Sequence, residues 1–562
     1  MATAHVYGQS AIDAYRISQP DMKGTARYMS MGGAFGALGG DLSSISQNPA
    51  GIGVYRSNEF GFTVDLDIQS ASSNTMGSKY DTNLTKFLLN NIGAVLTLKL
   101  PSTSCPNLNF GFTYNRSTTY NRKYGGNIPT LSNSMSNYIA GIANAENIVE
   151  SELATTSKYD PYNPGYNEYA PPWLAVLGYD SYLMTPAEYS DGTTRWYGQW
   201  GAETKGSGAF LVNERGSVGD YNIVIGGNIA NVVYWGMNFD ITNLNYNIDA
   251  LWGESMTNAY VPDQNNQAVR TSADWVMDNI YSVSGTGFQY QIGVIVKPIQ
   301  ELRLGLAFHT PTWYNLTETF GASVNYKYGD GEYGMADTNN GMLGYNQMSF
   351  RTPCKLIASA AGVIGSNFII SFDYEWTPYN KMKYSEAGSY GTGSSWDWDY
   401  GWGPGWDFLS SKASAGPATR ASFLESNDPY YYTNEDIKNY YTATNTFRLG
   451  AEFRVTPSFS VRAGYCNVSS PVKSEMKNEW QEVYTSGTLP NYRWDNQTNY
   501  VSLGLGYRFN RFFVDLAYVY KHMTSEYHAY TPDTYAGNDI PSPTSKVSLS
   551  NNQVVLSAGF RF

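Results

Sequence analysis

Apolar and polar side chains alternate along many segments of the chain, as they do in a β-strand whose two faces meet different surroundings. The C-terminal segment shows the pattern most clearly. One face carries apolar side chains throughout, namely Val554, Leu556, Ala558, Phe560 and Phe562. The opposite face carries mostly polar or small side chains, namely Gln553, Val555, Ser557, Gly559 and Arg561. An apolar outer face and a polar or small inner face are typical of strands in an outer-membrane β-barrel.

The alternation recurs along the whole chain. Phe60, Phe62 and Val64, for example, alternate with Gly61 and Thr63. We count roughly fourteen such segments, each near the ten or so residues that a tilted membrane strand needs. They lie at about 57–69, 91–100, 107–119, 207–215, 220–236, 285–297, 301–315, 351–363, 367–380, 443–455, 459–470, 497–509, 512–524 and 550–562.

The connections between these segments are alternately short and long. Residues 298–300, 456–458 and 510–511 are tight turns, whereas residues 120–206, 237–284, 316–350 and 381–442 are long insertions. Outer-membrane barrels have short turns on the periplasmic side and long loops outside. Apolar residues at helical spacing indicate some helix in the loops, near 134–154 and near 245–280. An even strand count places both chain ends on the periplasmic side.

The pattern therefore predicts an all-β fold, a 14-stranded antiparallel transmembrane β-barrel with long extracellular loops that contain some helix. Composition agrees with this, because 15% of the 562 residues are aromatic and only 15% are charged, against roughly 25% charged in soluble domains. No run of 18 apolar residues indicates a transmembrane helix. We expect the bacterial outer membrane as the location and outer-membrane lipid as a partner.

Several classes of function are excluded by the residues present. The net charge of −12 speaks against a nucleic-acid partner. Cys105, Cys354 and Cys466 lie far apart, so we expect neither a zinc site nor a disulfide framework. The four histidines stand outside any catalytic or metal-binding motif. We predict no enzyme, no cofactor and no metal.

Charged side chains recur at inner-face positions of the predicted strands. The candidates in the lumen are Arg303, Arg448, Glu452, Arg462 and Arg508. Charges enclosed in a barrel need a partner or water. They can serve as structural ion pairs that brace the lumen, or some can bind the headgroup of a ligand, and the sequence leaves both interpretations open.

One loop segment is unusually rich in tryptophan. Trp396, Trp398, Trp402 and Trp406 lie among Gly and Pro residues within 381–442. Exposed tryptophans need something to contact. Packing within the loop or at the membrane interface is one interpretation, and contact with a partner or ligand is the other.

The first 56 residues precede the first predicted strand and are rich in small residues. Residues 1–10 lack the basic and apolar regions of a signal peptide, so we expect a mature or re-started sequence. A segment of small residues can fold inside a lumen, because glycine permits tight turns and close backbone approach. The stretch includes a Met-Gly-Gly-Ala-Phe motif (Gly32, Gly33, Ala34, Phe35) and an Asn-Pro-Ala-Gly motif (Asn48, Pro49, Ala50, Gly51).

These two motifs resemble the N-terminal hatch of the FadL family of outer-membrane transporters for hydrophobic compounds. Several strand segments also resemble that family, for example 302–311, 447–453 and 503–509. The resemblance implies that residues 1–56 form a periplasmic segment and a plug in the lumen, and that residues 57–562 form the barrel. Phe560 and Phe562, at the end of the last strand, are the candidate C-terminal signal of the barrel.

The resemblance also implies two alternative functions. In the first, the barrel takes up small hydrophobic compounds such as long-chain fatty acids, binds them in the lumen and releases them sideways near the third strand. In the second, the chain is a non-transporting subunit of a secretion or barrel-assembly complex and contacts envelope proteins through its aromatic loops. The long Tyr- and Trp-rich loops look like those of Bacteroidota members of the family, which include such subunits.

Overall fold

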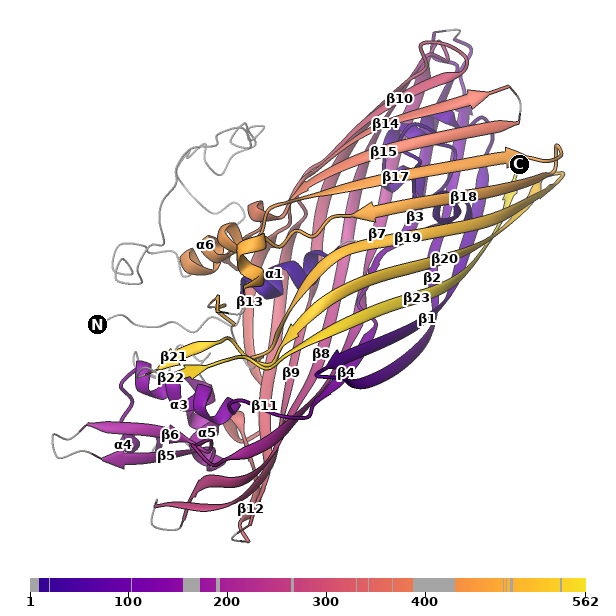
Figure 1. The fold of residues 1–562 in the computed structure, drawn as a ribbon. Coiled ribbons are helices and arrows are strands. Elements are labelled where there is room, and N and C mark those ends of the chain that lie inside the picture. Colours follow the sequence, from indigo (N-terminus) through magenta and orange to yellow (C-terminus); the bar gives the residue numbers. More distant parts are fainter. Residues whose placement is uncertain are drawn as a thin grey trace, which may run out of the picture.

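A computed structural model describes residues 10–19, 21–102, 104–154, 172–188, 193–263, 267–329, 331–341, 343–365, 367–387, 430–478, 480–481, 483–485, 489–535 and 538–562. Strands inclined to a common axis form the wall of a barrel (Figure 1). The N-terminal helices, drawn in indigo, lie within it.

Fourteen strands of the described residues form the closed wall, which confirms the predicted count and the antiparallel arrangement. Each strand pairs with the next, and β23 pairs with β1 to close the barrel. In order around the wall they are β1 (Glu59–Thr75), β2 (Ser78–Lys99), β3 (Asn107–Thr119), β7 (Lys205–Ile229), β8 (Val233–Pro262), β9 (Ala268–Val296), β10 (Leu302–His309), β14 (Lys355–Ile364), β15 (Phe368–Pro378), β17 (Ala443–Arg454), β18 (Phe459–Val468), β19 (Tyr492–Phe509), β20 (Phe512–His528) and β23 (Thr544–Arg561).

Further strands extend the wall or form small hairpins. Beyond β3 and β10, the wall continues in β4 (Arg122–Ile128), β11 (Trp313–Tyr328), β12 (Tyr333–Asp337), β13 (Gly344–Arg351) and β16 (Lys383–Glu386). Two separate hairpins are β5 (Met184–Glu188) with β6 (Thr194–Gly198), and β21 (Asp533–Tyr535) with β22 (Asn538–Ile540). All of these lie at one end of the barrel, which we call the long-loop end.

The opposite end, which we call the short-turn end, carries brief connections and closes the barrel. The amide nitrogen of Asn58 donates to the carbonyl oxygen of Phe562 over 3.1 Å, and the amide of Phe562 donates back to Asn58. From there β1 and β23 pair without a register shift from Glu59–Arg561 to Asn74–Lys546. The candidate terminal residues lie here, and the ring of Phe560 packs against Phe512 with centroids 4.8 Å apart.

The helices are short. They are α1 (Ala11–Ser18), α2 (Ala26–Ser30), α3 (Met135–Ala145), α4 (Glu150–Ala154), α5 (Trp173–Asp180) and α6 (Tyr431–Tyr440), with 3₁₀ turns η1 (Ser44–Ser46), η2 (Pro49–Val54), η3 (Thr338–Gly341), η4 (Tyr379–Lys381) and η8 (Ser474–Lys477). Within the described residues, no helix combines the length and apolar character needed to cross a membrane.

The two faces of the wall differ as the alternation predicts. Apolar side chains on the outer face are exposed, for example Phe60 at 44% and Leu556 at 42%, whereas Gly61, Thr63 and Gln553 on the inner face are buried. An exposed apolar band is what a barrel presents to lipid.

Two predicted loops are wrong. Residues 237–284 and 316–350 are mostly strand, in the long hairpin β8–β9 and in β11 to β13. The predicted helix near 245–280 is also wrong, because the described residues of that segment belong to the strands β8 and β9. The reason is a reversal of the alternation within β8. Nearer the short-turn end the buried face is polar (Asn238, Asp240, Thr242), and beyond Thr242 it is largely apolar (Leu244, Tyr246, Ile248, Ala250, Trp252).

This reversal follows from a change of surroundings along one strand. Where the outer face meets lipid, apolar side chains lie outside. Past the membrane the outer face meets water, and the inner face covers an apolar core, so the same strand exchanges its two faces. For this reason, the apolar spacing in this segment resembled that of a helix. The residues concerned are Ile248, Leu251, Trp252 and Met256.

Other boundaries also differ from the prediction. Segments 207–215 and 220–236 are not two strands, since β7 runs unbroken to Ile229 and β8 begins at Val233. The predicted number of fourteen strands is nevertheless correct, because two errors cancelled. The prediction divided β7 into two strands and assigned most of β8 to a loop. Helix in 134–154 is confirmed by α3 and α4. Within 381–442, β16 and α6 are described, and 388–429 lie outside the described residues.

Candidate functional site

The N-terminal segment runs through the lumen from the long-loop end to the short-turn end. Helix α1 contacts α6 at the long-loop end, whereas α2 and η2 contact wall strands near the short-turn end (Figure 1). Ser46 of η1 accepts a hydrogen bond from Asn115 of β3. The described part of the expected periplasmic segment, residues 10–19, thus lies at the opposite end from the periplasmic turns. We call residues 24–56 the short-turn plug.

Helix α1 is anchored by a capping box and by buried rings. The hydroxyl of Ser10 accepts from the amide of Asp13, and the Asp13 carboxylate accepts from the amide and hydroxyl of Ser10. Arg16 Nη1 lies 2.9 Å from Asp13 Oδ1, and Arg16 Nη2 donates to the carbonyl oxygen of Asn491. The Tyr15 ring packs edge-on against Tyr379 at 5.4 Å. This helix was not predicted, although the Ser-x-x-Asp spacing is a recognisable signature of a helix N-terminus.

Between α1 and α2, the fully buried side chain of a lysine forms ion pairs with the wall. Lys23 Nζ lies 2.8 Å from Asp65 Oδ2 and 3.1 Å from Asp67 Oδ2, and it also donates to Gln553. Burial alone would lower the pKa of Lys23. The nearby carboxylates, of which Asp67 and Asp65 act most strongly, together raise it by more than burial lowers it, so the pKa lies above the ordinary value and the ammonium stays charged.

Asp21, two residues before Lys23, also binds side chains of the wall. Its Oδ1 accepts from Lys521 Nζ and from the Tyr500 hydroxyl, each over 3.0 Å. Burial tends to raise the pKa of Asp21, but Lys521 and then Lys23 lower it to about 2. The linker between α1 and α2 is therefore bound to β1 and β20 by ion pairs and to β19 by a hydrogen bond.

The Met-Gly-Gly-Ala-Phe motif forms the turn after α2. Gly32 and Gly33 have φ angles of +61° and +74°, which L side chains rarely adopt. Ala34 and Phe35 are fully buried. The Phe35 ring packs against Tyr28, and the Arg27 guanidinium stands over it 5.2 Å from the centroid.

The Asn-Pro-Ala-Gly motif begins η2. The Asn48 side chain accepts from the amide of Ala50 as an N-cap, and its Nδ2 donates to the carbonyl oxygen of Gly36 over 2.6 Å. Pro49 occupies the first position of the turn, where its missing N–H costs nothing. The amide of Gly40 donates to the carbonyl of Gly51. The motif therefore folds the short-turn plug back onto its own first half.

Wall glycines accept this folded segment. A Cβ at Gly236 would overlap Pro49, at Gly293 would overlap Asn48, at Gly305 would overlap Gly36, and at Gly464 would overlap Gly32. These glycines come from four different strands, and each faces the plug backbone or the Asn48 side chain. The plug motifs therefore pack directly against these strand glycines.

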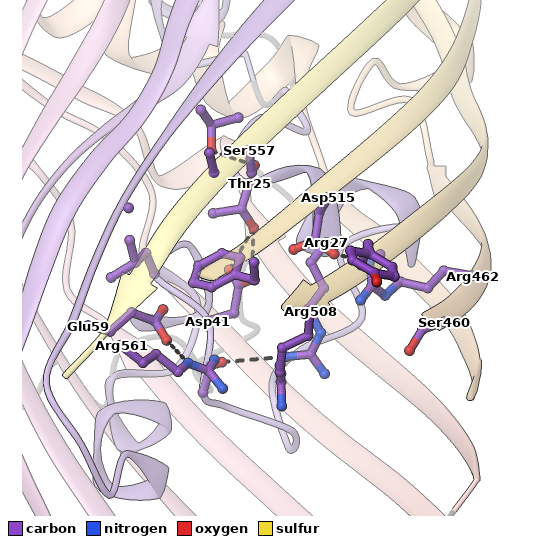
Figure 2. A pocket seen from close by; sticks show the side chains of 18 of the residues that line it. Thr25, Arg27, Asp41, Glu59, Ser460, Arg462, Arg508, Asp515, Ser557 and Arg561 are labelled. Carbon is purple, nitrogen blue, oxygen red and sulfur yellow. Dashed lines mark hydrogen bonds and ion pairs between the residues drawn. The ribbon is translucent and has the colours of Figure 1, made fainter. Parts of the chain in front are cut away.

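A cavity of about 90 Å³ lies between the plug and the wall at the short-turn end (Figure 2). Five arginines and four carboxylates line it: Arg27, Arg454, Arg462, Arg508, Arg561, Asp41, Glu59, Glu452 and Asp515. Glu452 Oε2 accepts from Arg462 Nε at 2.7 Å and from Arg27 Nε at 3.1 Å. Arg462 also bonds Asp515 at 2.6 Å, and Arg561 bonds Glu59 at 2.5 Å.

The lumen candidates separate into two groups. Glu452, Arg462 and Arg508 meet at this cavity. Arg303 instead donates to the plug carbonyl of Leu38 over 2.8 Å, and Arg448 bonds Glu375 over 2.7 Å on the neighbouring strand. The alternation placed all five on the inner face. It gave no signal for Arg27, which bonds Glu452, or for Asp41, which lines the cavity, because an irregular segment carries no periodic pattern.

The wall between β2 and β3 is incomplete. Their ladder runs from Lys99–Asn107 to Asn91–Asn115. Beyond it, residues 78–90 of β2 have no ladder partner in the described residues other than β1. Side chains bridge the seam instead, since Arg116 Nε donates to the carbonyl of Leu89 over 3.0 Å and Thr82 Oγ1 donates to the carbonyl of Lys123 over 2.6 Å.

A second, smaller polar cavity lies near the seam. It measures about 20 Å³ and is lined by both the linker and β3, including Asp21, Thr118 and Lys521. The remaining predicted residues, Trp396, Trp398, Trp402 and Trp406, lie outside the described residues.

Residues 203–562 match a family model described as outer membrane protein transport protein (OMPP1/FadL/TodX). No curated protein matches the chain. Solved structures similar to the chain include a FadL homologue of Pseudomonas aeruginosa, 12% identical with a TM-score of 0.48, covering 97% of this chain and 99% of the other. The toluene transporter TodX of P. putida is 11% identical with a TM-score of 0.47, covering 96% and 99%. The toluene transporter TbuX of Ralstonia pickettii is 13% identical with a TM-score of 0.44, covering 96% and 98%.

Proposed function

We propose a transport function from one premise, that the chain belongs to the OMPP1/FadL/TodX family of outer membrane transport proteins. It is accordingly a barrel of the bacterial outer membrane and not an enzyme. Its cargo in this proposal is a small hydrophobic compound such as a long-chain fatty acid. The cargo enters at the long-loop end, passes the plug formed within residues 1–56 of the barrel of residues 57–562, and leaves sideways between β2 and β3.

The interrupted β2–β3 ladder carries the proposal. A closed barrel pairs every backbone group along its wall, because unpaired groups in lipid cost several kcal/mol. Here the free edge of β2 is bridged by the Arg116 and Thr82 side chains. Side-chain bridges can open without breaking the barrel, and the nearby outer surface is apolar, with Phe87 exposed at 72% and Phe112 at 54%. Lateral release delivers an apolar cargo directly to lipid.

A reversible cross-link across the seam tests this route. In a background where Cys105, Cys354 and Cys466 are replaced by serine or alanine, Leu89→Cys with Arg116→Cys would be joined by a cleavable bis-maleimide. The matched control is Leu96→Cys with Phe110→Cys, a pair inside the intact ladder. Uptake of labelled oleate is measured in cells that lack their own long-chain fatty-acid channel.

We expect oleate uptake by the unlinked protein, a loss of several-fold on linking the seam, and recovery on cleavage. The control link should leave uptake unchanged. Folded protein in the outer membrane that takes up no oleate would overturn the cargo, and uptake unaffected by the seam link would overturn the lateral route.

A second function, as a non-transporting subunit of an envelope complex, is favoured by the surface at the long-loop end. Tyr333 is exposed at 79%, Met335 at 61% and Tyr345 at 54%, on β12 and β13. Exposed apolar groups of this kind mark protein interfaces. The tryptophan-rich segment 396–406 and the Bacteroidota-like loops of the sequence go with this alternative.

Extraction in mild detergent, followed by mass spectrometry of both lipids and proteins, separates the two functions. Bound fatty acid without protein partners supports transport. Stable envelope proteins that are lost in a Tyr333→Ser, Met335→Ser variant support the subunit. Recovery of the chain alone would count against the subunit.

A further inference from the structure

The short-turn cavity holds more positive than negative charge once its ion pairs are assigned. Glu452, Asp515 and Glu59 each accept from an arginine. Asp41 is held by the Thr25 hydroxyl and by the amide of Ser43. Five arginines therefore face four carboxylates, each of which already accepts at least one hydrogen bond.

The surplus charge is carried by Arg508. No ion pair or side-chain hydrogen bond of its guanidinium is present among the described residues. The charges that act on it most strongly include Arg561, Arg27 and Arg454, of the same sign, and Asp515, of the opposite sign. Figure 2 places Arg508 between Arg561 and Arg462 at the cavity. Like charges gathered in this way repel one another unless an anion lies between them.

The exposed residues of the cavity lie at the short-turn end. Arg508 is exposed and lies directly before the β19–β20 turn, whereas Arg462 and Glu452 are buried behind it. The Arg454 side chain, at the end of β17, is 45% exposed. Short turns face the periplasm in outer-membrane barrels. The mouth therefore opens toward the periplasm, away from the long-loop end.

Its size suits a headgroup and not a whole hydrophobic molecule. The volume of about 90 Å³ holds several water-sized groups, whereas pockets for entire drug-sized ligands are roughly 300–1,000 Å³. Arginine binds the planar or tetrahedral oxygens of carboxylate and phosphate with paired hydrogen bonds.

We propose that this cavity is a periplasmic oxyanion site, in which Arg508, flanked by Arg454 and Arg561, binds a carboxylate or phosphate group. The group is either a free anion or the headgroup of an amphiphile whose chain stays outside the cavity. The anion is held by the arginines of this cavity and not by the side chains that bridge β2 and β3, so the site does not depend on the transport proposal.

Calorimetric titration of the purified full chain in an uncharged detergent tests the site. The probes are inorganic phosphate, decanoate and decanol. The variant is Arg508→Gln, and the matched control is Arg511→Gln, which removes the same charge from the adjacent turn outside the cavity lining. Circular dichroism and heat-modified gel mobility confirm that both variants fold.

We expect decanoate to bind near one per chain and decanol not to bind at that site. Arg508→Gln should weaken binding about tenfold or more, as the loss of one charge-assisted bond predicts, and Arg511→Gln should change it by less than about twofold. Phosphate binding with the same dependence on Arg508 assigns the site to free oxyanions as well, and decanoate binding alone assigns it to amphiphile headgroups. Absence of anion binding, or equal binding by Arg508→Gln, would overturn the proposal.

Failure of this site and failure of transport give different results. Absent oleate uptake with Arg508-dependent anion binding removes the transport function and leaves the site. Normal oleate uptake without anion binding removes the proposed site and leaves the transport function.

Discussion

The two parts of the N-terminal segment are held in the lumen in contrasting ways. At the short-turn end, plug backbone lies directly on wall glycines, so that a Cβ at Gly236 or Gly464 would overlap it. At the long-loop end, α1 is held by side chains, with Ile12 and Tyr15 buried in a large cluster rich in tyrosine and tryptophan. Lys23 joins the two parts through its bonds to Asp65 and Asp67.

This contrast indicates different tolerances. Contact of backbone with backbone leaves no room for an added methyl group, whereas an apolar cluster can repack around a modest change of volume. We therefore expect the short-turn end to depend on fixed geometry and the long-loop end to depend on buried apolar area.

The largest effect is expected at the lysine between the two parts. Lys23→Met leaves Asp65 and Asp67 buried without their cation, which should destabilise the seated plug by about 3–5 kcal/mol. Thermal unfolding in detergent and protease cleavage of the N-terminal segment measure this. Adding Asp65→Asn and Asp67→Asn should restore much of the loss. Lys438→Met, which breaks an exposed pair with Glu435, is the control and should change stability little. Equal effects of the two single variants would contradict the special role of Lys23.

A methyl group added where the plug packs against a wall glycine should have the next largest effect. Gly464→Ala forces β18 away from Gly32 and should cost about 1–3 kcal/mol. We expect a protease-sensitive plug and a higher ionic conductance in planar bilayers. Gly362→Ala is the matched control, because a Cβ there meets only ordinary contact with Ile370. Unchanged conductance and plug protection in Gly464→Ala would refute the backbone contact.

Removal of one methylene group from the aromatic cluster should matter less. Ile12→Val in α1 should cost about 0.5–1.5 kcal/mol, because the cluster loses one methylene and otherwise keeps its packing. Unfolding temperatures of Ile12→Val and Gly464→Ala compare the two ends directly. A larger loss for Ile12→Val than for Gly464→Ala would reverse the proposed contrast.

The smallest effect concerns pH at the long-loop end. The Glu254 carboxylate, on the part of β8 beyond the membrane, accepts from the amide of Met135 and from Trp252 Nε1. Burial raises the pKa of Glu254 to about 7 despite these bonds. Because the folded pKa exceeds the unfolded one, stability is full below the unfolded pKa and falls as pH rises through about 7.

This shift corresponds to a loss on the order of 1 kcal/mol between about pH 6 and pH 8. The unfolding temperature of the wild type should fall over that range, and Glu254→Gln should reduce the fall. A wild type whose unfolding temperature is independent of pH there, or a variant with the same dependence, would contradict the raised pKa.

Much of the barrel could be predicted from alternation alone, because lipid outside and a polar lumen inside impose opposite demands on neighbouring residues. The segments at 107–119 and 443–455 coincide closely with β3 and β17. The same rule failed in β8 beyond Thr242 and in β11, where the outer face meets water and the inner face meets an apolar core. Alternation was still present there, but its sense was reversed.

The candidate site could be predicted only in part. The inward placement of Glu452, Arg462 and Arg508 follows from strand periodicity. Their partner Arg27 lies 425 positions from Glu452 in an irregular segment, and no local pattern links residues so far apart. The glycines of the plug motifs were visible, whereas the wall glycines that receive them resembled ordinary small residues of an inner face.

The sequence by itself determined that strands of two-faced character close into a membrane barrel, because the demands of lipid and lumen act residue by residue along each strand. It also carried the two plug motifs, because the left-handed turn after α2 requires glycine at positions 32 and 33, and the start of η2 requires a capping side chain followed by proline. Only the tertiary structure decided where α1 lies, where the β2–β3 ladder ends, and that Arg508 lines the cavity without an ion pair to a described carboxylate. Those outcomes depend on which distant segments meet, and the free energy of such contacts is set by packing in three dimensions.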